Sequence, residues 1–205
     1  MSKLPFSVLQ RMVHELIQPF YGIERATPLP KQFGGRHEND AEHSWGLALF
    51  ASALAPHIDE KLDVGLVCQF AVVHDLVEVY AGDTPNLASE KEKAGKEERE
   101  RLALEKLKEE FQELPWIIKT VAEYEKQSSG EAQFVRSLDK TLSLLQEYES
   151  DGNIFRDFKV TIDQFELMLR QHKRKAMVHE GAFEYYLAAE RLLLNNPHFF
   201  HSGHK

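Results

Sequence analysis

The stretch LDVGLVCQFAVVHDLVEVYAGD, residues 62–83, decides how the rest of the chain is interpreted. Its apolar residues go nearly all the way round a helical wheel, a pattern that predicts a buried central helix from about residue 63 to residue 80. The second half of this helix nevertheless carries His74, Asp75 and Glu78. Carboxylates are almost never fully buried without a partner, and moving one alone into an apolar interior costs several kcal/mol. These side chains therefore need a compensating partner.

The spacing of these three side chains suits a metal ion. His74 and Glu78 are four residues apart and Asp75 and Glu78 are three apart, so all three share one helix face. Imidazole and carboxylate together suit Zn, Mn, Fe or Co. The alternative on this stretch alone is a salt-bridged or solvent-lined patch near the end of a helix.

The composition indicates an ordinary globular protein. With 205 residues and 42% hydrophobic content, the chain has the size of one domain. The formal net charge of −8 and the lack of a basic stripe argue against a protein that binds a nucleic-acid polymer, although a few local cations would suffice for a small anionic substrate. The single cysteine, Cys68, excludes an intramolecular disulfide and fits a reducing cytosol.

No segment predicts export or a membrane span. The N-terminal residues lack an apolar region long enough for a signal peptide, and no apolar run approaches about 20 residues. We therefore expect a cytoplasmic protein with no membrane partner.

Helical periodicity dominates the remaining sequence, and no segment shows the alternation typical of β-strands, so we expect an all-α fold of six or seven helices. Besides the central helix, we expect helices over residues 4–20, 40–56, 88–114, 116–126, 131–150 and 161–195. Charges of alternating sign over residues 88–114 are typical of a charged surface helix. Residues 21–39 are rich in proline, glycine and basic side chains and are expected to form a loop.

Two further polar residues occupy unusual positions on apolar helices. His43 lies in the first turn of the helix over residues 40–56, from which it could reach His74 and Asp75, although a structural role is the ordinary alternative. Asp139 lies at the edge of the buried face of residues 131–150, where a surface aspartate is the ordinary alternative. Together with His74 and Asp75 they give the order H…HD…D on three helices.

This ordered set resembles the signature of the HD-domain metal-dependent phosphohydrolases. RHENDAEHS (36–44), HDLVEVYAGDTP (74–85) and RSLDKTLSLL (136–145) resemble the corresponding blocks of the bacterial 5′-deoxynucleotidase branch. The resemblance covers most of residues 20–150. It implies a helical HD domain with a core at about 20–150. The apolar periodicity predicts a C-terminal helix at 161–195 that packs on this core, and the histidine-rich end, 196–205, is expected to be a flexible tail, so that residues 1–205 form one domain.

The resemblance also implies a metal centre with one divalent ion, Mn, Co, Mg, Zn or Fe. The implied ligands are two histidines and two aspartates: His43, His74, Asp75 and Asp139. Glu78 matches the acidic residue beside the metal and would hold or deprotonate the attacking water. Asp83 matches an aspartate near the leaving-group oxygen and the sugar, which implies a general acid or a sugar contact.

Arg25 corresponds to the arginine that holds the 5′-phosphate, a role that suits a planar guanidinium. Its spacing from His43 is longer here by a few residues, and Ala26 stands where the family has a tryptophan. Arg36, in the RHEN block, is the alternative phosphate ligand.

The function implied by the resemblance is metal-dependent hydrolysis of nucleoside 5′-monophosphates, with deoxyribonucleotides preferred. The alternatives are a phosphodiesterase, a guanosine-polyphosphate hydrolase, or a non-catalytic regulatory module that binds nucleotides. An oxygen-activating di-iron protein would need more histidine ligands than the helical core supplies. The expected partners are a small-molecule nucleotide and a second copy of the chain, with the last long helix as the contact.

Overall fold

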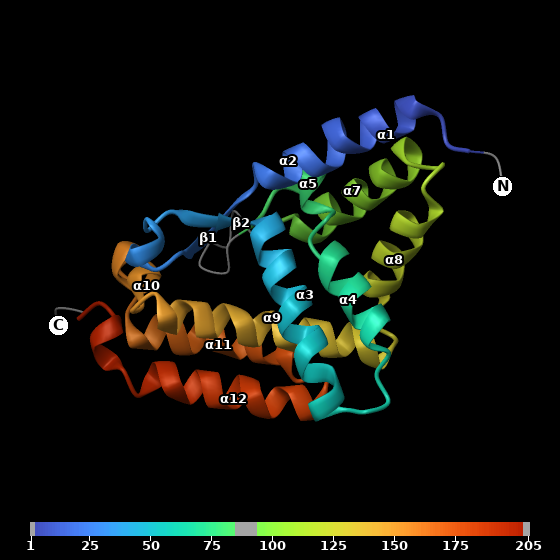
Figure 1. Cartoon of the computed structure of the whole chain (residues 1–205). Helices are drawn as coiled ribbons and strands as arrows, with labels where there is room; N and C mark the ends of the chain where they lie inside the picture. The colour runs from blue at the N-terminus through green and yellow to red at the C-terminus, as the bar shows by residue number, and fades with distance from the viewer. Residues whose placement is uncertain (1–2, 85–93, 203–205) are drawn as a thin grey trace.

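The computed structural model describes residues 3–84 and 94–202, and helices dominate them (Figure 1). The expected all-α class is confirmed. Three long helices, α9 (Gly130–Glu149), α11 (Ile162–Ala176) and α12 (Glu180–Leu194), pack together as one layer. Helices α3 (Asp40–Ile58) and α4 (Val64–Val73) pack on each other and against α9.

The N-terminal segment and the charged helix lie at the other end of the molecule (Figure 1). Helix α1 (Phe6–Met12), a π-helical segment (Val13–Ile17) and α2 (Gln18–Tyr21) follow one another without a break, which confirms the helix expected over 4–20. Helices α7 (Lys96–Glu110) and α8 (Pro115–Lys126) pack on each other. Residues 88–93 of the expected charged helix lie outside the described residues.

Helix α3 begins with a reciprocal cap that explains its position. The Asn39 side chain accepts a hydrogen bond from the Glu42 backbone N–H at 3.0 Å, and the Glu42 carboxylate accepts one from the Asn39 backbone N–H at 3.1 Å. The helix continues through Pro56 to Ile58, two residues beyond the expected end. The cap fixes the first turn of α3, and with it His43.

The central helix expected over 63–80 is divided in the structure. Helix α4 ends at Val73, residues 74–77 form a turn, and the short helix α5 (Glu78–Ala81) follows. Within the turn, backbone N–H groups bond three residues back, from Leu76 to Val73 at 3.0 Å and from Glu78 to Asp75 at 2.8 Å. The prediction of one continuous helix was wrong because this tighter bonding retains the apolar period while the α-helical ladder stops. Gly82, with a positive φ of 72°, ends α5.

The loop expected over 21–39 contains a small antiparallel sheet instead. Strand β1 (Glu24–Pro28) pairs with β2 (His37–Asn39), with Glu24 opposite Asn39, Pro28 opposite His37 and an irregular register between them. Too few residues alternate for the pattern to be visible in the sequence. The strands place Arg25 and Glu38 beside α3 and α9.

The C-terminal helix expected over 161–195 is also divided. Helices α11 and α12 are separated by residues 177–179, and the His179 side chain caps α12 by accepting a hydrogen bond from the Ala182 backbone N–H at 3.2 Å. A further short helix, α10 (Asn153–Asp157), follows α9. The sequence between α11 and α12 lacks proline, so the break was not visible.

The prediction of a flexible tail from residue 196 was wrong for residues 197–200. Pro197–Phe199 form a 3-10 helix, and two aromatic rings of this segment pack against the core. Phe199 and Phe200 are 4% and 8% exposed. The Phe200 ring lies 4.8 Å from that of Phe155 and 5.0 Å from that of Phe165, measured between centroids. Residues 203–205 lie outside the described residues.

One helical stretch, Val64–Ala81, has the length and apolarity of a membrane span, with a mean hydropathy of 1.5 over 18 residues. The core helix of a protein in water passes the same test. In the structure this stretch is α4, the turn and α5, and α4 packs against α3, α8 and α9. These contacts are those of a core helix.

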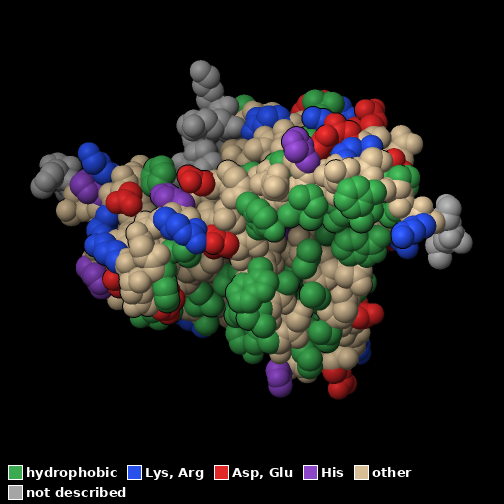
Figure 2. Space-filling view, turned by 45° about the horizontal axis from the view of Figure 1, so that its top comes forward, with side chains coloured by type: hydrophobic (Ala, Val, Ile, Leu, Met, Phe, Trp, Pro, Cys, Tyr) green, Lys and Arg blue, Asp and Glu red, His purple; other side chains and the backbone are tan. Residues whose placement is uncertain are grey.

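Apolar side chains gather on one face of the molecule (Figure 2). Trp45, Leu49, Val72 and Trp116 are exposed and line one apolar groove between α2, α3, α4 and α8. Exposed apolar patches of this kind mark interaction surfaces. The homodimer remains a prediction, and this groove offers it a contact other than the last helix.

Replacing Phe200 tests the packing of the C-terminal residues. We expect Phe200→Ala to lower the free energy of unfolding by about 3 kcal/mol, because it removes a buried ring from an aromatic cluster. The matched control is His201→Ala, whose side chain is exposed and which should change stability by less than about 0.5 kcal/mol. Urea unfolding followed by circular dichroism measures both variants. If Phe200→Ala unfolds at the same urea midpoint as the wild-type protein, the ring does not stabilise the fold and the prediction of a flexible tail is correct.

Candidate functional site

Four polar side chains from three segments meet at one place in the structure. His43 comes from α3, His74 and Asp75 from the turn after α4, and Asp139 from α9. Ligand atoms of the first three lie within 4.8 Å of one another. The Nε2 atom of His43 is 3.1 Å from Oδ1 of Asp139. The structure therefore brings all four expected metal ligands together.

The site lies where three apolar clusters meet. Val73 and Val77, on either side of the turn, belong to the cluster around α7 and α8. Leu138 belongs to the cluster of α3, α4 and α9, and Leu144 to the cluster of the C-terminal helices. The four polar side chains thus project from segments that the surrounding core holds in place.

His74 is prepared to bind a cation. Its Nδ1 is 2.9 Å from the carbonyl oxygen of Ala71. Because a carbonyl oxygen only accepts, Nδ1 carries the proton and Nε2 has a free lone pair. This Nε2 is buried, makes no hydrogen bond with the described residues, and lies 3.0 Å from Oδ2 of Asp75. An unprotonated imidazole nitrogen beside a carboxylate fits a divalent metal.

Glu38 supports His43 and was missed in the sequence. It is 2% exposed, and its Oε1 lies 3.1 Å from Nδ1 of His43. Its Oε2 accepts a hydrogen bond from the Gln146 amide at 2.7 Å. Carboxylates in this position fix the orientation and tautomer of a metal-binding histidine. The sequence carried no signal for it, because all three residues of β2 are polar and only the fold buries the middle one.

Arg25, on β1, is the central cation of the site. Its Nη1 lies 2.7 Å from Oδ2 of Asp75 and 3.0 Å from Oδ1 of Asp40, and its Nε lies 3.3 Å from Oε1 of Glu38. Burial opposes the charge, but the carboxylates of Asp75, Asp139 and Asp40 outweigh it and raise the pKa of Arg25 above its usual value. The guanidinium is therefore a fixed charge beside the candidate metal ligands.

Arg36 is not brought to the site. Its guanidinium is 55% exposed and pairs with both carboxylate oxygens of Glu42, with Nη1 at 2.8 Å from Oε2. It does not line the cavity at the site. The pairing restrains the first turn of α3, which is a supporting role.

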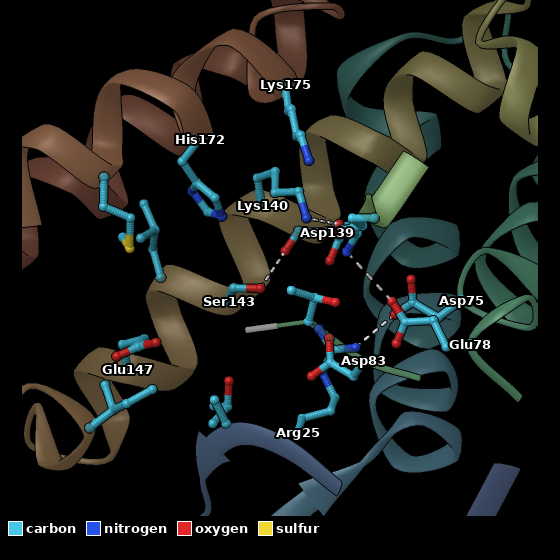
Figure 3. Close-up of a pocket in the computed structure, with 17 residues that line it drawn as sticks. Arg25, Asp75, Glu78, Asp83, Asp139, Lys140, Ser143, Glu147, His172 and Lys175 are labelled. Carbon is cyan, nitrogen blue, oxygen red and sulfur yellow. Dashed lines mark hydrogen bonds and ion pairs between the residues drawn. The ribbon is translucent and has the colours of Figure 1, made fainter. Parts of the chain in front are cut away.

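Glu78 and Asp83 both line the cavity beside the metal ligands (Figure 3). Glu78 is 5% exposed, and its buried Oε2 has no hydrogen-bond partner among the described residues. Burial and the carboxylates of Asp75, Asp83 and Asp40 raise the pKa of Glu78 to about 10. Burial also raises the pKa of Asp83. A bound cation would relieve the repulsion among these carboxylates, so the crowding itself supports a cation site.

Three lysines that the sequence analysis did not single out also line the cavity: Lys96, Lys140 and Lys175. The Nζ of Lys140 is 2.6 Å from Oδ2 of Asp139, and that of Lys96 is 3.9 Å from Oε1 of Glu78. Cations beside a carboxylate-rich site favour an anionic substrate. Lys96 was interpreted as part of a surface helix, and nothing in the sequence relates Lys175 to Asp139.

The cavity is elongated. Asp75 and Glu78 lie at one end, Glu147 lies at the other, and His172 projects toward the space between them (Figure 3). The cavity holds about 780 Å³ of space, its open mouth included. The volume open to the centre of a water molecule is about 90 Å³.

Comparisons with known proteins agree with this geometry. The model of a family described as HD domain matches residues 23–180. A solved structure of a predicted metal-dependent phosphohydrolase from Magnetospirillum magnetotacticum MS-1 is 28% identical, with a TM-score of 0.76, and covers 96% of each chain. PH0347 protein from Pyrococcus horikoshii OT3, 24% identical with a TM-score of 0.60, shares the fold over 92% of this chain and 99% of its own.

Curated relatives carry the name 5′-deoxynucleotidase HDDC2. The Homo sapiens protein is 33% identical over 121 residues, which are 56% of this chain and 56% of that protein. The Xenopus laevis protein is 36% identical over 121 residues, 55% of this chain and 56% of that protein. The chain thus spans about half the length of the curated relatives it matches.

Metal binding tests the site and the support that Glu38 gives to His43. We expect Glu38→Gln to weaken Mn²⁺ binding by about 10- to 100-fold, because the amide no longer fixes the imidazole. Asp75→Ala should weaken it further, because a ligand is lost. Glu24→Gln, an exposed change on the paired strand, is the matched control. Isothermal titration calorimetry on metal-stripped protein measures all three, and unchanged affinity in Glu38→Gln would contradict the supporting role.

Proposed function

Since the family model matches residues 23–180, this chain belongs to the HD domain family, and from that premise we propose that it is a metal-dependent phosphohydrolase of nucleoside 5′-monophosphates, with deoxyribonucleotides preferred. The observation that carries the proposal is the meeting of His43, His74, Asp75 and Asp139 beside a cavity lined by Arg25 and three lysines. Carboxylates and imidazoles suit the metal, and the cations suit a phosphate.

The comparisons support the two halves of the proposal unequally. The solved structure named as a predicted metal-dependent phosphohydrolase matches nearly the whole chain and supports the reaction class. The relatives named 5′-deoxynucleotidase match over about half of their length and support the nucleotide substrate.

The proposed cofactor is one divalent metal ion held by four side chains: His43, His74, Asp75 and Asp139. When bound, such an ion polarises a phosphoryl oxygen and lowers the pKa of water. Glu38 and the Ala71 carbonyl orient the two imidazoles. A second carboxylate group, formed by Asp40, Asp75 and Glu78, shares Asp75 with the first, but Arg25 already occupies its Asp40 side.

Arg25 and Lys140 are the proposed phosphate-binding residues. Arg25 offers a planar guanidinium on one side of the metal ligands, and Lys140 offers an ammonium on the other, next to Asp139. A guanidinium binds two phosphate oxygens through parallel hydrogen bonds, whereas an ammonium acts as a point charge. The two would hold the phosphate over the ligand set and fix its orientation for in-line attack.

Glu78 and Asp83 are the proposed proton-transfer residues. A cation bound beside Asp75 would lower the raised pKa of Glu78, and the ionised Oε2 could then orient the attacking water and accept its proton, with Lys96 3.9 Å from the other oxygen. Asp83 directly follows Gly82, the residue that ends α5, and lines the same cavity. There it can protonate the leaving 5′-oxygen or contact the sugar. The positive charges of Lys96 and Arg25 offset part of the negative charge of these two carboxylates.

The remaining proposals concern partners. We propose a small-molecule nucleotide substrate, a cytoplasmic location and a homodimer, with no nucleic-acid polymer and no membrane as partner. The alternatives are a phosphodiesterase, a guanosine-polyphosphate hydrolase and a regulatory nucleotide-binding module. The buried Oε2 of Glu78, which has no hydrogen-bond partner among the described residues, favours catalysis over regulation, because an idle site has no need of an unsatisfied buried oxygen.

Phosphate release from a panel of nucleotides tests the proposed function. Metal-stripped protein is assayed on 5′-, 3′- and 2′-monophosphates and on a diester and guanosine polyphosphates, after restoring Mn²⁺, Co²⁺, Mg²⁺, Zn²⁺ or Fe²⁺ in turn. We expect metal-dependent release from 5′-monophosphates, faster for deoxyribonucleotides. Release only from the diester or the polyphosphates would overturn the substrate, and release from none would favour the regulatory module.

Glu78→Gln separates proton transfer from metal binding. We expect kcat to fall by about 10²- to 10⁴-fold, because the amide cannot accept a proton from water. Mn²⁺ affinity should stay within about threefold, because Glu78 is outside the proposed ligand set. Steady-state kinetics and calorimetry on the same preparations provide the two values. Full activity in this variant would exclude Glu78 as the residue that handles the water.

A further inference from the structure

The end of the cavity away from the metal ligands is not used by the proposed chemistry. The cavity lining that belongs to or packs against the cluster of the C-terminal helices is small or apolar, and two polar groups line the cavity with it: Ala26, Leu144, Ile154 and Met168, with Glu147 and His172. These polar groups lie on the side of the cavity opposite Asp75 and Glu78 (Figure 3).

His172 presents an unpaired nitrogen to this space. The residue lies on α11, is 4% exposed, and lines the cavity. Its Nδ1 is 3.3 Å from the hydroxyl of Tyr186, whereas its buried Nε2 has no hydrogen-bond partner among the described residues. Burial and the charge of Lys140 lower the pKa of His172 to about 3, so the ring is neutral. It offers one uncharged hydrogen bond to whatever occupies the cavity.

Glu147 presents an unpaired oxygen to the same space. It lies on α9, two turns after Asp139, and its buried Oε2 has no hydrogen-bond partner among the described residues. Burial and the negative charge of Glu38 raise the pKa of Glu147 to about 8. Near neutral pH the group is therefore largely a carboxylic acid, which can donate and accept.

Two buried polar groups without partners at one end of a cavity call for a polar ligand, because leaving them unpaired costs free energy. A second phosphate is disfavoured there, because neither Glu147 nor His172 carries a positive charge to hold it. An ammonium group is disfavoured by the positive charges of Arg25, Lys140 and Lys175, which line the same cavity. An uncharged ligand with both donors and acceptors satisfies the site, and its apolar faces would pack on Ile154 and Met168.

We propose that this end of the cavity binds the base of the substrate, an uncharged planar nitrogen heterocycle whose donor and acceptor edge meets Glu147 and His172. The proposal rests on the proposed function for the identity of the ligand. It assigns base selectivity to α9 and α11, whereas the phosphate is held at the other end by Arg25 and Lys140. We refer to this end, defined by the six residues above, as the base subsite.

Nucleoside binding tests the base subsite without any reaction. The probes are deoxyadenosine, deoxyguanosine, deoxycytidine and thymidine, with deoxyribose as the probe that lacks a base. Saturation-transfer NMR and calorimetry on metal-free protein give the affinities. We expect the wild-type protein to bind at least one nucleoside about tenfold more tightly than deoxyribose.

The variants separate hydrogen bonding from shape. Glu147→Leu removes both polar atoms at similar size and should weaken nucleoside binding about tenfold. Glu147→Gln keeps a donor and an acceptor and should stay within about threefold of wild type. His172→Phe keeps an aromatic ring but has no nitrogen, and it should independently weaken nucleoside binding about tenfold. Glu149→Leu, an exposed change on the same helix, is the matched control. Circular dichroism melting checks that each variant is folded.

Kinetics with metal-loaded protein complete the test. Glu147→Leu and His172→Phe should each lower kcat/KM for the preferred deoxynucleotide about tenfold. The kcat/KM for deoxyribose 5-phosphate, which has no base, should stay the same as in the wild-type protein. Equal loss on both substrates, or no nucleoside binding by the wild type, would overturn the base subsite and indicate that only water occupies it. Nucleoside binding that depends on Glu147, together with hydrolysis of no monophosphate, would instead overturn the proposed function and leave the subsite intact.

Discussion

The ion pairs of Arg25 are the interaction on which the rest of the site depends. One guanidinium lies within 3.3 Å of carboxylate oxygens of Glu38, Asp40 and Asp75, which come from β2, α3 and the turn after α4. Without it, these like charges would be packed together with only the histidines as partners. The small sheet has a clear purpose in this arrangement, since pairing β1 with β2 delivers Arg25 and Glu38 together. The hairpin of β1 and β2 is thus a structural part of the site.

The turn at residues 74–77 is the second constraint, because it changes which way the central residues face. In a continuous helix, His74 and Glu78 would share one face through the i, i+4 spacing alone. The tighter turn keeps them close and also lets Asp75 contact Arg25. The apolar cluster around α7 and α8 holds the turn in place through Val73 and Val77. Packing around this short irregular segment holds Asp75 where the carboxylates converge.

The site residues that could be predicted from the sequence are those whose polarity differs from that of the apolar segment around them. His74, Asp75 and Asp139 are polar on apolar helical faces, so their pattern was visible, and the structure brings them together with His43. Glu38 and Lys175 are ordinary residues in ordinary surroundings, and only contacts between distant segments give them a role. The divided helices escaped detection for a related reason, because the apolar period continues across both breaks. Phe200 looked like part of a polar tail, since the local sequence could not reveal Phe155 and Phe165 as its partners.

Helix α9 links the two ends of the cavity. Asp139, Ser143 and Glu147 are spaced by four residues, so they follow one another along a single face of one helix. The first belongs to the metal ligands, and the last belongs to the base subsite. The distance between phosphate and base recognition is therefore set by the rise of a rigid helix and not by a loop. A ligand that spans this distance engages the proposed phosphate-binding residues and Glu147 at once, whereas a shorter one leaves the buried Oε2 of Glu147 without a partner. This geometry favours a whole nucleotide over a free sugar phosphate.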